Sequence, residues 1–577
     1  MTALDWTVLI ATIGFITIYG TLRTRGVRDV EGYFRGAHKL RWPTIGLSIM
    51  ATQASAITFL STPGQAFEDG MAFVQFYFGL PLAMVVISAV FVPIYHRLKV
   101  YTAYEYLEHR FDARVRYLGA LLFLIQRGLA TGVTIYAPAI LLSSILGWSL
   151  HAMNLGMGMI VIVYTVLGGV DAVSQTQKQQ MVVMLSGMLI ALVVIVLRLP
   201  DQVSLPHAVR LAGALERMNA VSFDLDLHSR YNFWSGITGG FFLALSYFGT
   251  DQSQVQRYLS GRSVAESRLG LLFNGIFKIP MQALILFSGA MLFVFYLFNA
   301  PPLFFNQELL DKVAAGPHAP QLQALEQRHG ELFAAQRSAA IDYLGALDSG
   351  GDASAAKRGL QRAAADNAEL RAQTRQLIAT AVPGAELKDA DYVFLGFVMR
   401  YLPSGLVGLL IAVILCAAMS SIASELTALG STTTLDLYQR WSGRPLPPQR
   451  GLLLSKLFTA LWGVVAVAFA GFAALLDNLI EAVNILGSLF YGTQLGLFLV
   501  GFFLRGIGAR AVFIAALIAQ AGVLALYFWT ELGFLWFNVV GSALVVGSSV
   551  LLQPIVRGPT RPQSAGGDPK PAAERRA

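Results

Sequence analysis

Three serines lie inside one apolar segment, within a stretch of five residues. They are Ser420, Ser421 and Ser424, in the run that begins at Ala417. The surrounding segment, Leu406 to Leu429, is long and apolar enough to cross a bilayer. A hydroxyl in hydrocarbon must find a partner, because lipid offers none. Oxygen atoms suit a hard cation bound between helices, but small and hydroxyl residues also let helices pack closely without an ion. The segment alone permits both interpretations.

A buried arginine is the second feature with chemical consequences. Arg127 lies deep within the apolar segment 117–146. A charge at that depth is costly and usually faces a cavity or an ion partner. The planar fork of arginine fits a carboxylate. Two interpretations follow: Arg127 binds an anionic substrate, or it forms a buried pair with Glu425 or Glu481.

Composition places these residues in a membrane protein. Of the 577 residues, 55% are hydrophobic and 13% are charged. Apolar runs predict about thirteen transmembrane helices. These lie near 5–22, 43–62, 72–95, 117–146, 152–170, 179–199, 232–250, 270–298, 403–430, 453–475, 479–504, 510–530 and 533–553. The prediction is an all-α polytopic protein, since a β-barrel would alternate apolar and polar residues.

Several functional classes find no support in the sequence. There is no HExxH motif, no P-loop and no Ser/His/Asp set, so no enzyme is expected. The single cysteine, Cys416, lies within a span and gives no disulfide framework or thiolate metal site. The first segment has no basic region and no cleavage site, and we interpret it as a retained helix.

The distribution of basic residues predicts the orientation. Lys and Arg gather in alternate connections, at 23–41, 97–116, 257–268 and 440–450 and in the tail. The opposite connections near 63–71, 147–151 and 476–478 contain none. The positive-inside rule then places the N-terminus outside and the C-terminus inside. The net charge of +8 reflects this bias, and no nucleic-acid partner is expected.

One long insert interrupts the pattern. Residues 301–400 join two spans on the predicted outer side. Within it, 319–347 and 355–381 are rich in Ala, Gln, Glu, Arg and Leu, with apolar residues at roughly helical spacing. We predict an extracytoplasmic helical hairpin that serves as a cap or spacer, or that binds a specific ligand.

Four motifs, in order, resemble the sodium:solute symporter family. Their order and spacing make the resemblance specific, and it covers 40–550 apart from the insert. The motifs are Gly168-Gly-Val-Asp-Ala-Val173 followed by Thr176, then Thr250-Asp-Gln-Ser-Gln-Val-Gln-Arg-Tyr-Leu259, then Lys278-Ile-Pro-Met-Gln282, and lastly Ser420 to Tyr438, which ends in Thr432-x-x-x-Asp436-x-Tyr438.

The resemblance implies a LeuT-like fold of two inverted five-helix repeats. The implied divisions are a leading helix and cytoplasmic loop (1–42), the repeats (43–199 and 232–504, the second containing the insert), two further helices (505–553) and a disordered cytoplasmic tail (554–577). The first helix of each repeat is expected to be unwound near the membrane centre. Gly236, Gly239 and Gly240 could break the second such helix, whereas Ser48 to Thr62 contains no Gly or Pro.

The resemblance also implies a sodium site. Its ligands would be the carbonyl groups of Ala51, Ala54 and Ala417 and the hydroxyl groups of Ser420 and Ser421. A second sodium site, found in some members, needs an aspartate where this chain has Gln177, and a serine where it has Ala423. We therefore expect one sodium ion per cycle.

The substrate cavity is expected between core helices 1, 2, 3, 6, 7 and 10. The candidate substrate-binding residues are Gln53, Ser55, Thr58, Phe73, Phe76, Tyr77, Arg127 and Lys278. A glutamate replaces Tyr77 in sugar transporters of the family, so Tyr77 argues against a sugar. Asp251 and Gln252 are candidates for the inner gate.

The expected function is sodium-coupled import of a small polar or anionic solute, such as a carboxylate, across a plasma (bacterial inner) membrane. Its partners are that solute and the lipid bilayer, with no obligate protein partner. Two alternatives remain: a proton-coupled symporter that uses Glu425 or Asp251, and a nutrient sensor that retains the fold without transport.

Overall fold

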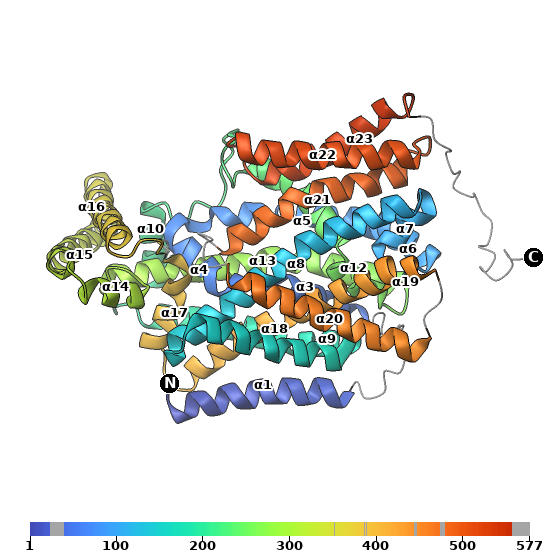
Figure 1. Ribbon diagram of the computed structural model, residues 1–577. Helices are drawn as coiled ribbons and strands as arrows, with labels where there is room; N and C mark the ends of the chain where they lie inside the picture. Colours follow the sequence, from blue (N-terminus) through green and yellow to red (C-terminus); the bar gives the residue numbers. More distant parts are fainter. Residues whose placement is uncertain are drawn as a thin grey trace, which may run out of the picture.

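The protein is described by a computed structural model, and the long helices of its core run in roughly the same direction (Figure 1). The described residues are 1–23, 40–350, 352–385, 387, 389–443, 447–472 and 479–556. Predictions for the loop at 24–39, for Arg444, for the connection at 476–478 and for residues 557–577 of the tail lie outside them.

Helices account for nearly all of the described membrane core. The first half contains α1 (Ala3–Arg23), α3 (Trp42–Gln53), α4 (Ala56–Asp69), η1 (Gly70–Tyr77), α5 (Leu80–Val86), η2 (Ile87–Phe91), α6 (Val92–Leu98), α7 (Ala103–Arg110), α8 (Ala113–Leu146), α9 (Leu150–Leu197) and α10 (Leu205–Ala214). The second half contains η3 (Ser235–Gly239), α11 (Gly240–Gly249), α12 (Gln252–Leu259), α13 (Val264–Phe298), α14 (Gln307–Ala314), α15 (Ala319–Asp348), α16 (Ser354–Ala381), α17 (Ala390–Tyr401), α18 (Leu406–Thr432), η4 (Thr433–Tyr438), α19 (Gln439–Ser442), α20 (Pro448–Ala470), α21 (Leu479–Phe503), α22 (Ala509–Trp529) and α23 (Leu535–Leu552).

Many of these helices can span a membrane. Among the described residues, nine helical stretches are long and apolar enough to do so, and two shorter apolar helices accompany them. One of the nine, Ala56–Leu98, contains the predicted span 72–95 and the end of the span 43–62. Helix α9 contains the predicted span 152–170 and most of the span 179–199. The count of about thirteen spans stays a prediction.

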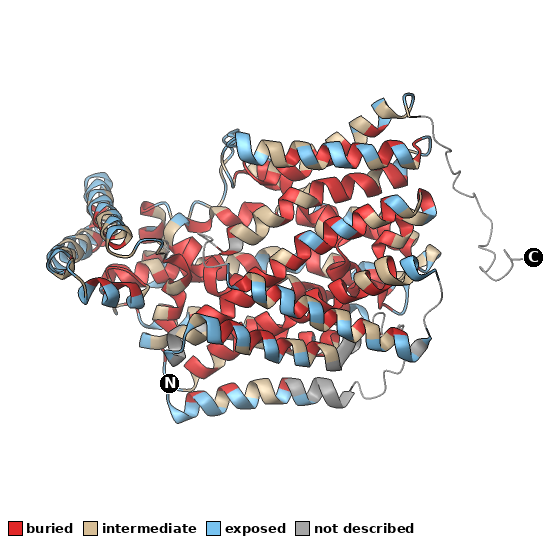
Figure 2. Ribbon diagram, in the orientation of Figure 1, coloured by how far each residue is buried: buried red, intermediate tan, exposed pale blue. Residues whose placement is uncertain are grey.

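Burial separates a central bundle from a lipid-facing shell. Helix α18, which carries the three serines, is buried along almost its whole length. It packs against α8, α9 and α20. Buried residues fill the centre of the bundle, whereas α1, α22 and the α15–α16 hairpin show many exposed residues (Figure 2).

The first helix of the bundle is broken in its middle. Helix α3 ends at Gln53, and α4 begins at Ala56. Between them Ala54 leaves the helical conformation, with φ −84° and ψ 78°, and Ser55 is extended. No glycine or proline marks this break, so the sequence only permits it. The break frees backbone groups at the centre of the bundle.

The second broken helix is interrupted elsewhere than expected. The chain is helical through Gly236, Gly239 and Gly240, and the break falls at Thr250–Asp251. The glycines serve close packing instead, because a Cβ at Gly236 would overlap the backbone of Gln75. Asp251 starts α12 as its N-cap, accepting a hydrogen bond from the Ser253 N–H at 2.9 Å.

The insert contains two long helices that pack against each other, α15 and α16. They project from one end of the bundle (Figure 1). Arg371 on α16 binds the buried carboxylate of Asp389 at 2.9 Å, and Arg375 approaches Glu68 on α4 at 3.5 Å. The hairpin is therefore attached to α4, the second half of the broken helix.

Candidate functional site

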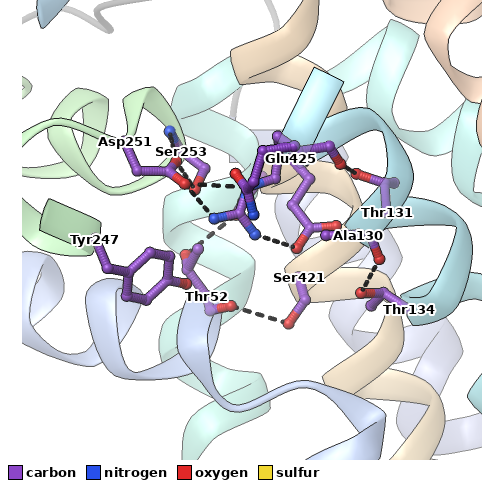
Figure 3. Close-up of polar contacts among 12 residues, drawn as sticks. Thr52, Ala130, Thr131, Thr134, Tyr247, Asp251, Ser253, Ser421 and Glu425 are labelled. Carbon is purple, nitrogen blue, oxygen red and sulfur yellow. Dashed lines mark hydrogen bonds and ion pairs between the residues drawn. The ribbon is translucent and has the colours of Figure 1, made fainter. Parts of the chain in front are cut away.

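Oxygen atoms converge where α18 passes the break between α3 and α4. The Ser420 hydroxyl donates to the Ala51 carbonyl at 3.0 Å and to the Ala417 carbonyl at 2.9 Å. The Ser421 hydroxyl lies 3.1 Å from the Thr52 carbonyl oxygen and 3.5 Å from that of Ala51 (Figure 3). The side chains of both serines are buried. Four of the five predicted sodium ligands thus gather at one point.

The fifth predicted ligand lies at the break itself. Ala54 is fully buried, and its N–H bonds to the Met50 carbonyl at 2.8 Å. Its non-helical ψ turns its carbonyl away from the α3 axis. The end of α3 also contributes the negative end of its helix dipole. This neutral oxygen set fits a small hard cation.

Gln177 on α9 occupies the neighbouring position with its own hydrogen bonds. Its amide nitrogen donates to Ser424 Oγ at 2.7 Å, to the Ser420 carbonyl at 3.0 Å and to Thr52 Oγ1 at 3.1 Å. Its amide oxygen accepts from Ser48 Oγ at 2.5 Å. An uncharged NH₂ group therefore lies among oxygens that could otherwise surround a cation.

A cavity of about 90 Å³ lies beside these oxygens. Six of the eight predicted substrate-binding residues line it: Gln53, Ser55, Thr58, Phe76, Tyr77 and Arg127. Its remaining lining residues are Thr52, Ile57, Thr134, Leu243, Tyr247, Glu425, Val483, Asn484 and Tyr491. The walls come from α3, α4, η1, α8, α11, α18 and α21.

A cluster of buried partners holds Arg127 at this cavity, and Figure 3 labels two of them, Asp251 and Glu425. Its guanidinium pairs with Asp251 and donates to Glu425 Oε1 at 3.1 Å. The Tyr491 hydroxyl accepts from Arg127 at 2.6 Å and lies 3.1 Å from Asp251 Oδ2. The predicted pair with Glu425 is present, whereas Glu481 pairs with Arg230 instead.

The cluster has one cation and two carboxylates. Asp251 Oδ1 also accepts from Ser253 Oγ at 2.6 Å, so both of its oxygens are bonded. Glu425 Oε2 has no hydrogen-bond partner among the described residues, although Glu425 lines the cavity. The cavity is thus bordered by a fully bonded aspartate and a glutamate with one free oxygen.

The other predicted gate residue lies one position along the chain. Gln252 accepts from the Ala103 N–H at 3.0 Å and donates to the Tyr101 carbonyl at 3.1 Å. Gln252 therefore connects α12 to the start of α7 and does not line the cavity. A movement that separates α12 from the start of α7 would break these two hydrogen bonds.

Two predicted substrate residues lie behind the cavity wall. Phe73 packs against Phe76 and Tyr77, with ring centroids 5.3 and 5.8 Å apart. Lys278 on α13 lies with its Nζ 5.3 Å from the centroid of the Tyr77 ring. Neither residue belongs to the cavity lining. Helix α13, expected to border the cavity, contributes no lining residue.

Sequence reasoning missed several cavity residues. The α21 residues Val483, Asn484 and Tyr491 and the α11 residue Tyr247 lie in ordinary apolar segments, and no local pattern separates them from packing residues. The sequence did mark Glu425 as a candidate, because an ionisable residue within a membrane span indicates a functional position. Its location in the cavity wall required the fold.

Comparison with known proteins extends this picture. The sequence model of the sodium:solute symporter family matches residues 33–314 and 370–519. This match covers most of the chain and leaves out 315–369, which include all of α15 and part of α16. The family is one of transporters, not enzymes.

Two curated relatives illustrate the range of the family. The human sodium/iodide cotransporter is 37% identical over 285 residues, which are 49% of this chain and 43% of that protein. The sodium-coupled monocarboxylate transporter 1 of Xenopus laevis is 25% identical over 497 residues, which are 86% of this chain and 67% of that protein. The chain thus spans less than half of the length of the human relative.

A solved structure shares the fold over nearly the whole chain. A sodium-coupled sialic acid symporter in a substrate-bound, outward-open state aligns with a TM-score of 0.75 at 20% sequence identity. The alignment covers 97% of this chain and 100% of the other. The likeness shows the LeuT-like, all-helical membrane fold that the motifs implied.

Proposed function

Because the chain belongs to the sodium:solute symporter family, we propose that it carries a small organic solute across a membrane together with sodium. The observation that carries this proposal is the meeting of the Ala51 and Ala417 carbonyls with the Ser420 and Ser421 hydroxyls at the break in α3–α4. Sodium is cargo at this site. It joins α18 to the broken helix and so stabilises one conformation of the cavity beside it.

Coupling follows from the shared helix break. The sodium ligands end α3, and the cavity residues Ser55, Ile57 and Thr58 begin α4. An ion that fixes the break also fixes the start of α4, so each ligand favours the conformation that binds the other. In alternating access, loss of sodium on the low-sodium side would then release the solute.

The cavity favours a small solute with an anionic group. The N-terminus of α4 opens into it, and a helix N-terminus attracts anions through its free N–H groups and its dipole. Ser55 and Thr58 add hydroxyls there, while Phe76 and Tyr77 supply an apolar wall. On the other side Arg127 is already paired with Asp251 and Glu425, so the N-terminus of α4 is the proposed partner of the anionic group. We infer a carboxylate of a few carbon atoms, consistent with the size of the cavity.

One sodium ion per cycle is the proposed stoichiometry. The amide of Gln177 already satisfies the oxygens of Thr52, Ser420 and Ser424. A second cation would have to displace three hydrogen bonds without gaining a carboxylate ligand. We also propose a plasma membrane location and inward transport.

The test is the thermal stability of the purified protein in sodium chloride and in potassium chloride. Sodium at about 100 times its dissociation constant stabilises a one-site protein by about 2.7 kcal/mol. We expect this shift in sodium only, and we expect Ser421→Ala to abolish it. Ser431→Ala is the matched control, because Ser431 is also a buried α18 serine but bonds only to Ala428. An equal sodium shift in Ser421→Ala would refute the site.

Proton coupling is the second candidate, and the free Oε2 atom of Glu425 in the cavity favours it. A carboxylate there could carry a proton between the two sides of the membrane. Uptake that depends on pH and not on sodium, and that Glu425→Gln abolishes, would support this function. Uptake that requires sodium at every pH would exclude it.

A further inference from the structure

A second cavity lies at one end of the bundle, between the start of α8 and the start of α22. Its volume is about 190 Å³, and none of its lining residues belongs to the cavity at Arg127. The residues that line it are Asp112, Arg114, Ala509, Arg510, Phe513 and Ile514. We call it the basic cavity, because two of these six residues are arginines.

Hydrogen bonds fix the chain segments that form the basic cavity. Arg110, the last residue of α7, donates to the Leu504 carbonyl at 2.9 Å and to the Arg505 carbonyl at 3.0 Å. The Gly508 N–H donates to Gln553 Oε1 at 2.7 Å. The connection between α21 and α22 is therefore attached both to α7 and to the end of α23, and the basic cavity has fixed walls.

The charge of the basic cavity is positive. Neither the Arg114 nor the Arg510 guanidinium takes part in an ion pair or a side-chain hydrogen bond with a described residue. The one acid in the lining is Asp112, the N-cap of α8, whose Oδ1 accepts from the Arg114 N–H at 2.9 Å and the Val115 N–H at 3.1 Å. Two guanidinium groups thus face one carboxylate that is already bonded to backbone.

Neighbouring arginines have partners within the protein. Arg116, on the next turn edge of α8, pairs with Glu108 at 2.8 Å and with Asp436 at 2.7 Å. Arg110 bonds to the carbonyl groups at the end of α21. Arg114 and Arg510 differ from these two, because their charge is left for a ligand.

The basic cavity lies where two membrane spans begin. The apolar stretches that can cross a bilayer start at Ala113 and at Ala509, so Arg114 and Arg510 lie at the level of the lipid headgroups. Below Arg510, Ile514 and Leu517 lie on the same face of α22 and are exposed.

Helix α8 presents a similar face. Leu121 and Ile125 follow Arg114 at intervals of seven and four residues, so the three side chains share one face, and both apolar residues are exposed. Exposed apolar residues within a membrane span face acyl chains. Each arginine therefore lies above an apolar, lipid-facing strip of its own helix.

We propose that the basic cavity binds the headgroup of an anionic phospholipid from the leaflet at this end, which is predicted to be cytoplasmic. The guanidinium groups of Arg114 and Arg510 bind the phosphate oxygens, for which their planar forks are suited. The acyl chains follow the apolar strips of α8 and α22. A basic pocket between helices near the cytoplasmic surface fits such headgroups. The bound lipid joins α8, which carries Arg127, to α22.

The experiment measures thermal unfolding of the purified protein in detergent with added lipid. The lipids are dioleoylphosphatidylglycerol, which is anionic, and dioleoylphosphatidylethanolamine, which has the same chains and no net charge. Inorganic phosphate is the soluble anion. The variants Arg114→Gln and Arg510→Gln remove one charge each. Arg505→Gln is the matched control, because Arg505 is an exposed arginine at the same end that does not line the basic cavity.

We expect phosphatidylglycerol to raise the melting temperature at lower concentration than phosphatidylethanolamine, and inorganic phosphate to have no effect. Arg114→Gln and Arg510→Gln should each raise the half-maximal concentration of phosphatidylglycerol by about fivefold, the effect of one basic residue near a membrane surface. Arg505→Gln should leave it unchanged. Equal stabilisation by both lipids, or an equal loss in Arg505→Gln, would overturn the proposal, and stabilisation by inorganic phosphate would assign the site to a free anion instead.

A variant that gains affinity excludes misfolding as the cause. Asp112→Asn keeps an N-cap side chain for α8 and removes the negative charge from the basic cavity. It should lower the half-maximal concentration of phosphatidylglycerol by a similar factor, without changing that of phosphatidylethanolamine. Unchanged affinity for phosphatidylglycerol in Asp112→Asn would show that the charge of the cavity does not select the lipid, and the proposal would fail. Neither result depends on sodium coupling.

Discussion

At the scale of single residues, the amide of Gln177 joins three helices where an ion could join them. It bonds to Ser48 and Thr52 of α3 and to Ser420 and Ser424 of α18 from its own place on α9. All of its polar hydrogen-bonding capacity is used within a fully buried region. Such a network is strong because every member is satisfied.

Gln177→Asp should turn this position into a cation site. The new carboxylate would be costly when alone but would offer an anionic oxygen beside Ser424 and Thr52. We expect lower stability in potassium and a steeper dependence of thermal stability on sodium, with a Hill coefficient rising from about 1 toward 2. Gln177→Asn, which keeps a neutral amide, should stay near 1. An unchanged sodium dependence in Gln177→Asp would show that the Gln177 amide is not what excludes a second ion, and a Hill coefficient near 2 in the original chain would contradict the one-ion proposal.

Arg127 also acts through its partners. It neutralises part of the charge of Asp251 and Glu425 within the bundle. Arg127→Met should lower stability by about 3–5 kcal/mol, because two carboxylates lose their cation in a buried place. Thermal unfolding in detergent measures the loss.

A compensating variant checks the cause of this loss. Adding Asp251→Asn and Glu425→Gln to Arg127→Met should restore much of the stability, because no buried charge is then left unpaired. If Arg127→Met is as stable as the original chain, the cluster does not depend on Arg127. If the triple variant is less stable than Arg127→Met, lost packing rather than charge explains the effect.

At the scale of elements, the half-helix α4 is held by a backbone-to-backbone approach. Gly64 lies so close to α17 that a Cβ would overlap the Ala390 carbonyl. Phe67, one turn later, packs against Phe293, Tyr296 and Phe305 with centroids 5.5 to 5.9 Å away. One end of α4 thus meets the proposed sodium site, and the other meets the helices around the insert.

Gly64→Ala should separate α4 from α17. Inserting a methyl group against backbone costs about 1–3 kcal/mol, and a shifted α4 would also weaken sodium binding at the other end of the helix. We expect a lower melting temperature together with a smaller sodium-dependent shift. Gly156→Ala is the matched control, because its Cβ would meet nothing within 4 Å. If Gly64→Ala keeps the full sodium-dependent shift in melting temperature, moving α4 away from α17 does not affect sodium binding at the other end of the helix.

At the scale of the whole molecule, the insert and the basic loops mark opposite ends of the bundle. The α15–α16 hairpin lies at the left end in Figure 1, and α7, with Arg110 near its end, lies toward the other. The positive-inside pattern predicts that the hairpin end is outside the cell. Gly330 on α15 has open space around it and suits a labelling site.

Cysteine labelling of intact cells tests this orientation. In the Cys416→Ala background, Gly330→Cys should react with a membrane-impermeant maleimide added outside, and Arg114→Cys should react only after the cells are opened. The physical reason is the cost of moving basic loops across the membrane during insertion. The reverse pattern would invert the orientation and the proposed direction of solute release.

The sequence was sufficient for the parts of this protein that depend on local pattern. Apolar length predicted membrane helices, because a bilayer admits only backbone that bonds to itself. Four motifs in order predicted the family, which the family match confirms. They also predicted the LeuT-like fold, with which the structural likeness agrees. The pairing of Arg127 with Glu425 was one of two interpretations that Arg127 allowed.

Only the tertiary structure decided where separate segments meet. The break at Ala54–Ser55 has no glycine or proline signal, and the glycines at 236–240 pack closely instead of breaking their helix. Lys278 lies behind Tyr77, Asp251 binds Arg127, and Tyr491 completes the cavity from a segment far along the chain. These are contacts between helices, and the spacing of residues within one helix gives the face of a side chain but not what that face touches.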